Sequence, residues 1–156
     1  MKRIMVALCL ITVLLALAGC GGGSAAPTSA TSSTPSTQMP GTEVKVSGGS
    51  YWAITPAELY GFKVKDFFLV NVDTAPDTVL ASTDLFIKPE DVAQNLDKFP
   101  ADKNTKIVVY CIAGVNSVTV AEALVGYGYT RVMELGGGTM RWLQQGYPAV
   151  KYTAAP

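Results

Sequence analysis

The residue best suited to chemistry in this sequence is Cys111, in the stretch VVYCIAGVNS. Cys111 follows the apolar run at residues 107–110 and precedes a short loop that leads into a helical pattern. The sequence contains no histidine, so the most common general base and the most common metal ligand are both missing. Two interpretations remain: Cys111 is a thiolate nucleophile, or it is a small and inert core residue.

The N-terminal segment indicates export. It has a basic start, an apolar run at residues 4–16 and small residues before Cys20, which is the layout of a secretory signal peptide. A transmembrane helix is the alternative, but it needs about 20 apolar residues, more than this run provides. The LAGC stretch at residues 17–20 resembles the bacterial lipobox, which implies that residues 1–19 are removed and that Cys20 carries the lipid. We therefore expect a lipoprotein of the bacterial cell envelope, anchored to a membrane, with its domain exported from the cytoplasm.

The other cysteines offer Cys111 no disulfide partner, because Cys9 would leave with the signal and Cys20 would be acylated. Residues 20–50 are rich in Gly, Ser, Thr and Pro, and we interpret them as the lipid-anchored cysteine and a flexible linker. Residues 51–156 then form one domain, since 156 residues with 49% apolar side chains support one core rather than two. The balanced charge, twelve basic and twelve acidic residues, gives no indication of a nucleic-acid partner.

Apolar runs of strand length alternate with amphipathic stretches along this domain. Thr55, Pro56 and Glu58 have the spacing of a capping box, which predicts the start of a helix of two or three turns. The other predicted elements are strands at residues 67–72, 107–110 and 131–135, and helices at residues 89–99, 118–125 and 139–145. This alternation predicts an α/β fold with a mostly parallel central sheet and helices on both faces.

Such a sheet places Cys111 where functional sites form, because binding crevices lie at the carboxyl ends of the strands. The loop at residues 112–116 runs into the amino end of a helix, whose first N–H groups lack partners within the helix and carry partial positive charge. These amides can bind an anion and therefore favour the thiolate of Cys111. Gly114 permits a positive φ that turns the amides toward the sulfur. The prediction requires that the sulfur be reachable from solvent.

The order and spacing of these segments resemble the rhodanese family of sulfurtransferases over residues 51–148. The resemblance is carried by ITPAEL, FFLVNV, TDLFI, KIVVYCIAGVNS, ALVGYGYTRVMEL and GGGTMRW followed by GYP. It implies a three-layer α/β domain in which Cys111 accepts sulfane sulfur as a persulfide and passes it to cyanide or to a thiol. It also implies a mechanism without a metal or an organic cofactor, whose partner is a small sulfur donor or a protein persulfide.

The same resemblance implies roles for the residues that follow Cys111. Ser117 would hydrogen-bond the sulfur or cap the following helix. Gly137, Gly138 and Trp142 match a late Gly-Gly and Trp pattern, which we interpret as turn and packing residues. The implied substrate-binding residues are those of the loop and the first helical turn: Ile112, Ala113, Gly114, Val115, Asn116 and Ser117.

The cysteine loop departs from the family pattern because it lacks the arginine that active members usually carry there. A charge-assisted hydrogen bond contributes about 1.5 to 3 kcal/mol, so we expect weak use of thiosulfate. Asn71, Val72 and Asp73 replace the usual Asp-Val-Arg at the end of the first strand. Asp73 either faces the pocket, where it would repel anions, or lies in solvent. At residues 78–80 the sequence reads Thr-Val-Leu where the family has Gly-His-Ile.

Two functions follow from these matches and departures. The first is a sulfurtransferase that uses Cys111, and the alternative is a catalytically degenerate rhodanese module that binds an anion or a protein partner. Two related chemistries are disfavoured. Cysteine phosphatases need an arginine six residues after the cysteine, where Ser117 stands, and dithiol exchange needs a second nearby cysteine.

Overall fold

A central sheet organises residues 39–153, the part of the chain that the computed structural model describes. Its strand order is β1-β2-β7-β6-β3-β5, and all neighbouring strands are parallel except the antiparallel edge pair of β1 and β2. The strands of this sheet are β1 Thr42–Val46, β2 Gly49–Ile54, β3 Phe68–Asn71, β5 Leu85–Phe86, β6 Ile107–Tyr110 and β7 Val132–Leu135. A second, antiparallel sheet pairs β4 Thr78–Val79 with β8 Val150–Lys151.

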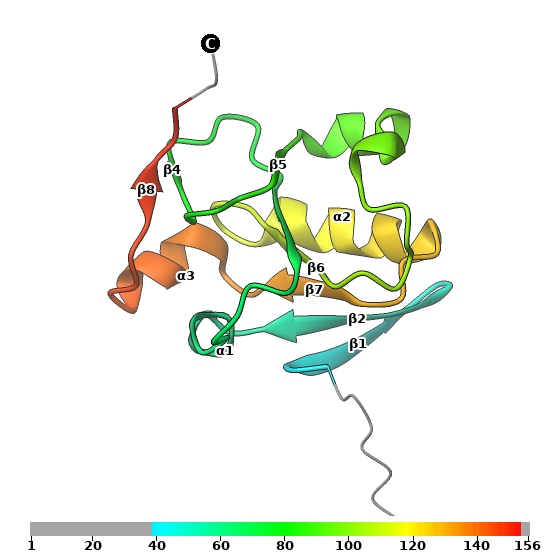
Figure 1. Ribbon diagram of the computed structural model, residues 1–156, viewed down its shortest axis with the longest axis horizontal. Helices are drawn as coiled ribbons and strands as arrows, with labels where there is room; N and C mark the ends of the chain where they lie inside the picture. Colours follow the sequence, from blue (N-terminus) through cyan, green and yellow to red (C-terminus); the bar gives the residue numbers. More distant parts are fainter. Residues whose placement is uncertain (1–38, 154–156) are drawn as a thin grey trace, which may run out of the picture. The chain divides into compact units, whose positions relative to one another are not determined.

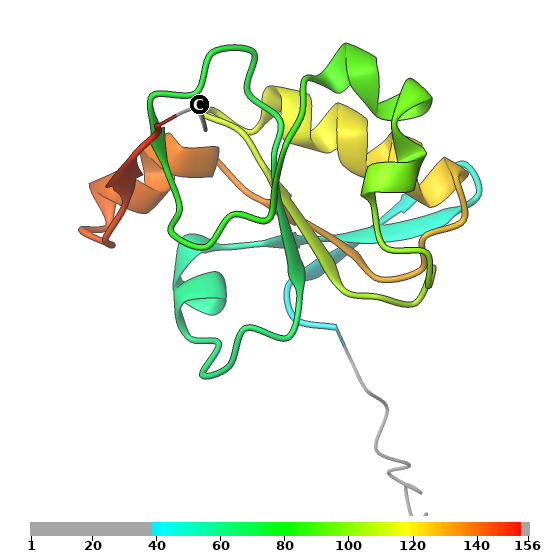
Figure 2. The same cartoon turned by 45° about the horizontal axis from the view of Figure 1, so that its top comes forward.

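Helices cover both faces of the central sheet. The long helix α2 (Val115–Gly126) lies on one face together with the 3-10 helices η1 (Pro89–Gln94) and η2 (Leu96–Lys98) (Figure 1). The shorter helices α1 (Pro56–Tyr60) and α3 (Gly138–Gln144) pack on the opposite face, and Figure 2 shows α1 and α2 on the two sides of the strands. The prediction of a three-layer α/β fold with a mostly parallel central sheet is confirmed.

Two apolar cores result from the alternation of side chains along the central strands. In β6, Val109 faces the core under α2, whereas Val108 faces the core under α1 and α3. In β7, Val132 and Met133 divide in the same way. Because every residue of β6 and β7 is buried, the two strands read as nearly continuous apolar runs.

The predicted capping box forms at the start of α1. The Thr55 hydroxyl accepts a hydrogen bond from the Glu58 N–H at 3.2 Å, and the Glu58 carboxylate accepts one from the Thr55 N–H at 2.7 Å. The predicted length of two or three turns is wrong, because the helix has five residues and ends at Gly61.

The predicted linker is too long at its C-terminal end, because β1 and β2 form a hairpin that includes residues 42–50. Val44 and Val46 alternate with polar residues, are half-buried and pack against the α2-side core, and Gly48 adopts a φ of 93° in the turn. The Gly- and Ser-rich composition obscured this short strand pattern. Residues 1–38, which include the predicted signal peptide, Cys20 and most of the linker, lie outside the described residues.

The predicted helix at residues 89–99 is also wrong in type. The chain there forms the 3-10 helices η1 and η2, interrupted at Asn95, whose backbone leaves helical geometry with φ −129° and ψ 37°. Val92 and Phe99 are nevertheless buried against the α2-side core, as the apolar pattern predicts. None of the helices between residues 39 and 153 is long and apolar enough to cross a membrane.

Candidate functional site

Cys111 directly follows β6, the strand between β3 and β7, at the carboxyl end of the parallel sheet. Gly114 caps the amino end of α2 with a φ of 91°, and its N–H donates a hydrogen bond to the Cys111 sulfur at 3.1 Å. The predicted positive φ of Gly114 is therefore confirmed, and it turns one loop amide onto the sulfur. A bond of this kind stabilises a negative sulfur more than a neutral one.

The sulfur is less accessible to solvent than the predicted role as a nucleophile requires. Cys111 exposes only 2% of its surface, whereas Ile112 and Val115 in the loop above it expose 56% and 72%. The loop that presents an amide to the sulfur thus also covers it. In this conformation the structure therefore does not meet the requirement that the sulfur be reachable from solvent.

A serine and a buried carboxylate lie on the inner side of Cys111. The Ser117 hydroxyl, in the first turn of α2, lies 3.6 Å from the Cys111 sulfur and donates to Glu134 Oε1 at 2.7 Å. Of the two roles implied for Ser117, the contact with the sulfur is present, and Ser117 does not cap the helix. Cys111 follows β6, Ser117 lies in α2 and Glu134 lies in β7, and the three residues form one hydrogen-bonded chain.

Glu134 is the site residue that sequence reasoning missed. It lies in β7 beside Ala53 of β2 and Val109 of β6, is 3% exposed, and has no ion-pair partner among residues 39–153. Burial raises the pKa of the Glu134 carboxyl, and the hydrogen bond from Ser117 opposes part of this rise. The available signal was a charged residue inside the apolar strand pattern RVMEL.

Asp73 binds the outer part of the cysteine loop. Its Oδ1 accepts a hydrogen bond from the Ile112 N–H at 2.9 Å. The Asn71 side chain donates to Asp73 Oδ2 at 3.2 Å and accepts a hydrogen bond from the Asp73 N–H at 3.0 Å. The half-buried carboxylate is therefore not a free solvated group. Asp73 also lines an open pocket of about 240 Å³, together with Phe86, Lys88 and Tyr152. It engages one of the amides that the sequence analysis assigned to an anion, so Ile112 does not offer its N–H in this conformation.

The other predicted binding residues remain around the loop. Val115 and Asn116 begin α2, where N–H groups have no partners inside the helix, and the Asn116 side chain lies 3.5 Å from the Val72 carbonyl. Ile112, Ala113 and Val115 present apolar side chains to solvent. Residues 111–117 contain no lysine or arginine, so within this segment the attraction for an anion comes from backbone amides. The side chain of Arg141 packs against Gly137, next to Gly114 of the loop.

The start of α3 fixes the cysteine backbone from the other side. The N–H groups of Thr139 and Met140 donate to the carbonyls of Cys111 and Ile112, both at 2.9 Å. A Cβ at Gly138, whose φ is 56°, would lie 2.0 Å from the Cys111 carbonyl oxygen. The interpretation of Gly137 and Gly138 as turn and packing residues is therefore confirmed, and only glycine permits this close backbone contact.

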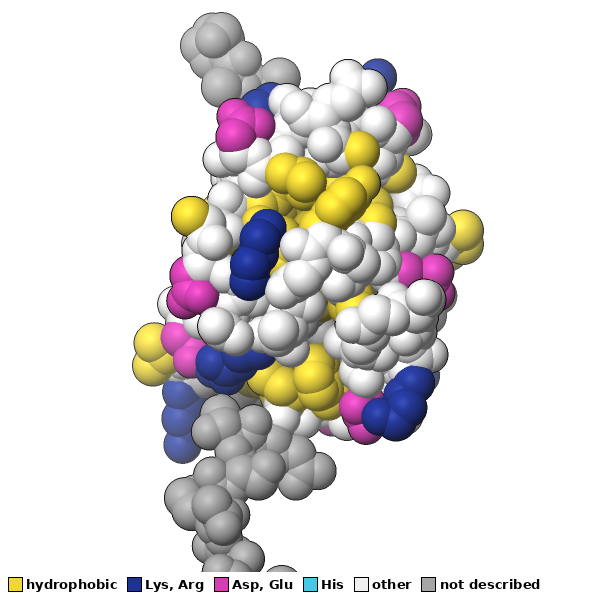
Figure 3. Space-filling model, turned by 90° about the vertical axis from the view of Figure 1, so that its right-hand side faces the viewer, with side chains coloured by type: hydrophobic (Ala, Val, Ile, Leu, Met, Phe, Trp, Pro, Cys, Tyr) yellow, Lys and Arg dark blue, Asp and Glu magenta, His cyan; other side chains and the backbone are white. Residues whose placement is uncertain are grey.

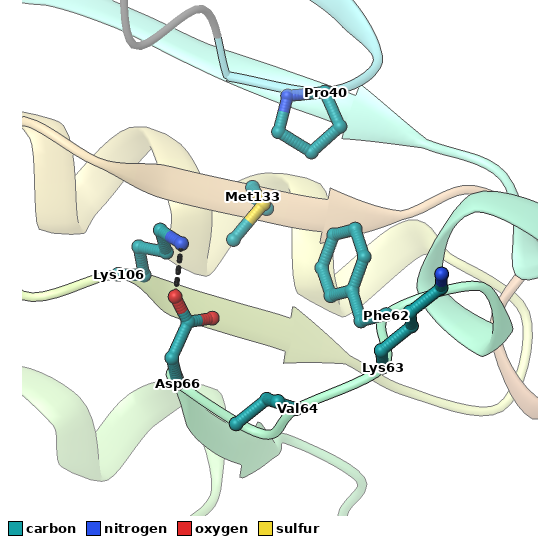
Figure 4. A pocket seen from close by; sticks show the side chains of 7 residues that line it. All are labelled: Pro40, Phe62, Lys63, Val64, Asp66, Lys106 and Met133. Atoms are coloured by element: carbon teal, nitrogen blue, oxygen red, sulfur yellow. Dashed lines mark hydrogen bonds and ion pairs between the residues drawn. The ribbon is translucent and has the colours of Figure 1, made fainter.

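A separate cavity lies at the amino end of the sheet, away from Cys111. It has a volume of about 280 Å³, and an ion pair between Asp66 and Lys106 lies at its edge (Figure 4). The lining residues are Pro40, Phe62, Lys63, Val64, Asp66, Lys106 and Met133.

Within the described part of the chain, no group of three or more His, Cys, Asp or Glu side chains is placed to hold a metal ion. Figure 3 shows basic and acidic side chains interspersed on one face, without a large patch of one sign.

Comparisons with known proteins agree with this geometry. Residues 70–145, which include Cys111, Ser117 and Glu134, match the family profile of the rhodanese-like domain. A rhodanese-related protein from Thermoplasma volcanium has a similar structure, with a TM-score of 0.53 and 23% identity over 63% of this chain and 96% of that chain. The rhodanese-like domain of an Anabaena protein gives a TM-score of 0.56 and 20% identity over 67% of this chain and 85% of that chain. The chain therefore contains a rhodanese-like domain.

A curated relative is a sulfurtransferase from Allochromatium vinosum. It is 34% identical over 55 residues, which are 35% of this chain. The matched region covers 50% of the length of that relative.

Proposed function

We propose that this rhodanese-like domain is a sulfurtransferase that carries sulfane sulfur as a persulfide on Cys111. The observation that supports this most directly is the Gly114 N–H, which points at the sulfur from 3.1 Å at the carboxyl end of the parallel sheet. The N–H groups of the first turn of α2, which have no partners within the helix, directly follow Gly114 in the chain. Backbone dipoles held in place before the reaction stabilise negative charge without reorganisation, and sulfur transfer places negative charge on this sulfur.

The transfer has two balanced steps. The Cys111 thiolate attacks the outer sulfur of a persulfide donor, a new S–S bond forms, the donor S–S bond breaks, and the donor leaves as a thiolate. An acceptor thiolate or cyanide then attacks the outer sulfur on Cys111, which releases an acceptor persulfide or thiocyanate and restores the Cys111 thiolate. No metal or organic cofactor takes part in either step.

The charge around the loop selects the donor. Residues 111–117 carry no cation, and the carboxylate of Asp73 lies at the Ile112 N–H, so a dianion such as thiosulfate has no clamp. Neutral, monoanionic or protein-borne persulfides do not need one. The apolar side chains of Ile112, Ala113 and Val115 form the surface that such a donor meets first.

The function is tested by the thiocyanate that the purified protein produces from a persulfide donor and cyanide. We expect production by the wild type, faster with glutathione persulfide than with thiosulfate, and background production by Cys111→Ser. Equal production by both proteins would remove the enzyme function.

A second candidate function is a degenerate module that binds an anion or a protein partner without turnover. Two observations favour it, the 2% exposure of Cys111 and the engagement of the Ile112 N–H by Asp73. The module predicts thermal stabilisation by sulfur oxyanions or peptides that persists in Cys111→Ser. A panel that gives no stabilisation at the cysteine loop would remove this candidate.

We also propose that the protein acts in the bacterial cell envelope, anchored through lipidated Cys20. The LAGC stretch supports this proposal. Metabolic labelling with a fatty acid should mark the wild type, and Cys20→Ala should lose both the label and its membrane fraction. Labelling of neither protein would contradict the anchor.

A further inference from the structure

Glu134 is a carboxylate in an apolar core with one hydrogen-bond donor, Ser117, that also contacts Cys111. The distances are 2.7 Å from Ser117 Oγ to Glu134 Oε1 and 3.6 Å from Ser117 Oγ to the Cys111 sulfur. Glu134 is 3% exposed, Cys111 is 2% exposed and Ser117 is fully buried. Burial of an ionised carboxylate without a paired cation lowers the stability of the fold, so the presence of Glu134 at this position requires an explanation.

A single serine hydroxyl can link the two acidic groups in either direction. In one arrangement the Cys111 thiol donates to Ser117, which donates to an ionised Glu134. In the other arrangement a protonated Glu134 donates to Ser117, which donates to the Cys111 thiolate. The two arrangements differ by the passage of one proton from sulfur to carboxylate, and the cluster carries one negative charge in both.

We propose that Glu134 is a positioning residue that accepts the Cys111 proton through Ser117, so that thiol and carboxyl share one negative charge in the closed site. This inference rests on the proposed function, in which Cys111 reacts as a thiolate. The thiol proton moves from the Cys111 sulfur to Ser117 Oγ while the Ser117 hydroxyl proton moves to Glu134 Oε1, so Ser117 remains neutral. The Gly114 N–H stabilises the thiolate from the opposite side.

The groups around the cluster support this exchange. Burial raises the pKa of Glu134, which makes this carboxylate a better proton acceptor than an exposed one. From β2, the Tyr51 phenol faces Glu134, and its own pKa is raised by burial and then by the charges of Glu134 and Glu122. On the loop side the charged groups are Asp73, which is bound to the Ile112 N–H, and Arg141 of α3, whose side chain packs against Gly137. Within residues 39–153 no cation forms an ion pair with Glu134, so no such pair confines the negative charge to this carboxylate.

Two groups that share a charge titrate as a pair rather than separately. Removal of the first proton gives a singly charged cluster in which a fixed fraction of the sulfur is thiolate. The reactivity of Cys111 should therefore rise in two steps with pH, with a plateau between them. A thiol that titrates alone gives one step, below which its reactivity falls about tenfold per pH unit.

The test is the rate of Cys111 alkylation by iodoacetamide as a function of pH, followed by peptide mass mapping of the full chain. We expect two steps in the wild type, and one step with slower alkylation near neutral pH in Glu134→Gln. Glu122→Gln, an exposed glutamate on α2, is the matched control and should keep both steps. If Glu134→Gln does not fold, as judged by circular dichroism, Ser117→Ala removes the link and should also lose the plateau.

The result separates a proton acceptor from a mere charge nearby. If Glu134 only repelled the thiolate, Glu134→Gln would alkylate faster near neutral pH. That outcome, an unchanged profile, or a single step in the wild type would overturn the inference. The failure would be distinct from that of the proposed function, because sulfur transfer by Cys111 is measured separately and depends on no particular proton acceptor.

Discussion

The two ends of the parallel sheet hold their polar groups in different ways. At the carboxyl end, Cys111, Ser117 and Glu134 are buried and linked by hydrogen bonds, and the Cys111 carbonyl is bound by α3. At the amino end, Asp66 and Lys106 form an ion pair that is partly exposed to solvent beside a cavity (Figure 4). Buried polar networks depend on every member, whereas exposed ion pairs contribute little. Substitutions should therefore have much larger effects at the carboxyl end.

The largest effect is expected for Gly138→Ala. The new methyl group would lie 2.0 Å from the Cys111 carbonyl oxygen, at a φ of 56° that side chains rarely adopt. We expect the free energy of unfolding to fall by roughly 3 kcal/mol, from overpacking and backbone strain together. Urea unfolding followed by circular dichroism measures this loss.

Gly126→Ala is the matched control for that substitution. Gly126 ends α2, and a Cβ there would meet nothing within 4 Å. We expect unchanged or slightly increased stability, by about 0.5 kcal/mol, because alanine restricts the unfolded chain more than glycine. A similar loss in both variants would show that the contact between α3 and Cys111 has no special importance.

A pH-dependent effect is expected for Glu134→Gln. Because the pKa of Glu134 is raised from 4.5 in the folded protein, the unfolded chain loses this proton first as pH rises. The contribution of Glu134 to stability is therefore greatest below pH 4.5 and declines as pH rises toward the folded pKa. The variant should gain stability relative to the wild type over this window, in urea titrations at successive pH values.

Glu58→Gln should show the opposite sign. Hydrogen bonds from the Thr55 backbone and hydroxyl lower the pKa of Glu58 below 4.5, so its contribution is present above that pH and is lost on acidification. If Glu134→Gln lost stability relative to the wild type as pH rose, the buried carboxylate would be held ionised, and the contrast between the two glutamates would fail.

The smallest effect is expected for Lys106→Met at the amino end. The side chains of Lys106 and Asp66 are 25% and 56% exposed, and ion pairs at such sites contribute about 0.5 kcal/mol or less. The free energy of unfolding measured in urea should change by no more than this amount, and the rate of Cys111 alkylation should be unaltered. A marked change in Cys111 alkylation would mean that the two ends of the sheet are coupled.

Much of the architecture follows from local patterns in the sequence. The apolar runs of β6 and β7 and the capping box at Thr55 predict the sheet and the start of α1, because burial and capping act within a few residues. The helix predicted at residues 118–125 is present as α2, but it begins earlier, at Val115, within the predicted loop. The hairpin of β1 and β2 was missed, since the apolar side chains of β1 are only half-buried and the turn lies in a Gly- and Ser-rich stretch.

The site was predictable only in part, for a physical reason. Cys111 and Gly114 are three residues apart, so their contact follows from one turn of chain. The contact between Ser117 and Glu134, and that between Asp73 and Ile112, depend on the strand order and join residues far apart in the sequence. Burial of Cys111 likewise depends on how the loop folds over the sulfur, which spacing does not specify.

The most direct test of the central claim is the mass of Cys111 after incubation with glutathione persulfide and removal of excess donor. We expect one added sulfur atom, mapped to the Cys111 peptide, that cyanide removes as thiocyanate. We also expect slow loading, because the sulfur is buried. A Cys111 that gains no sulfur from a reactive donor, in a protein that is folded, would contradict the proposed sulfur transfer.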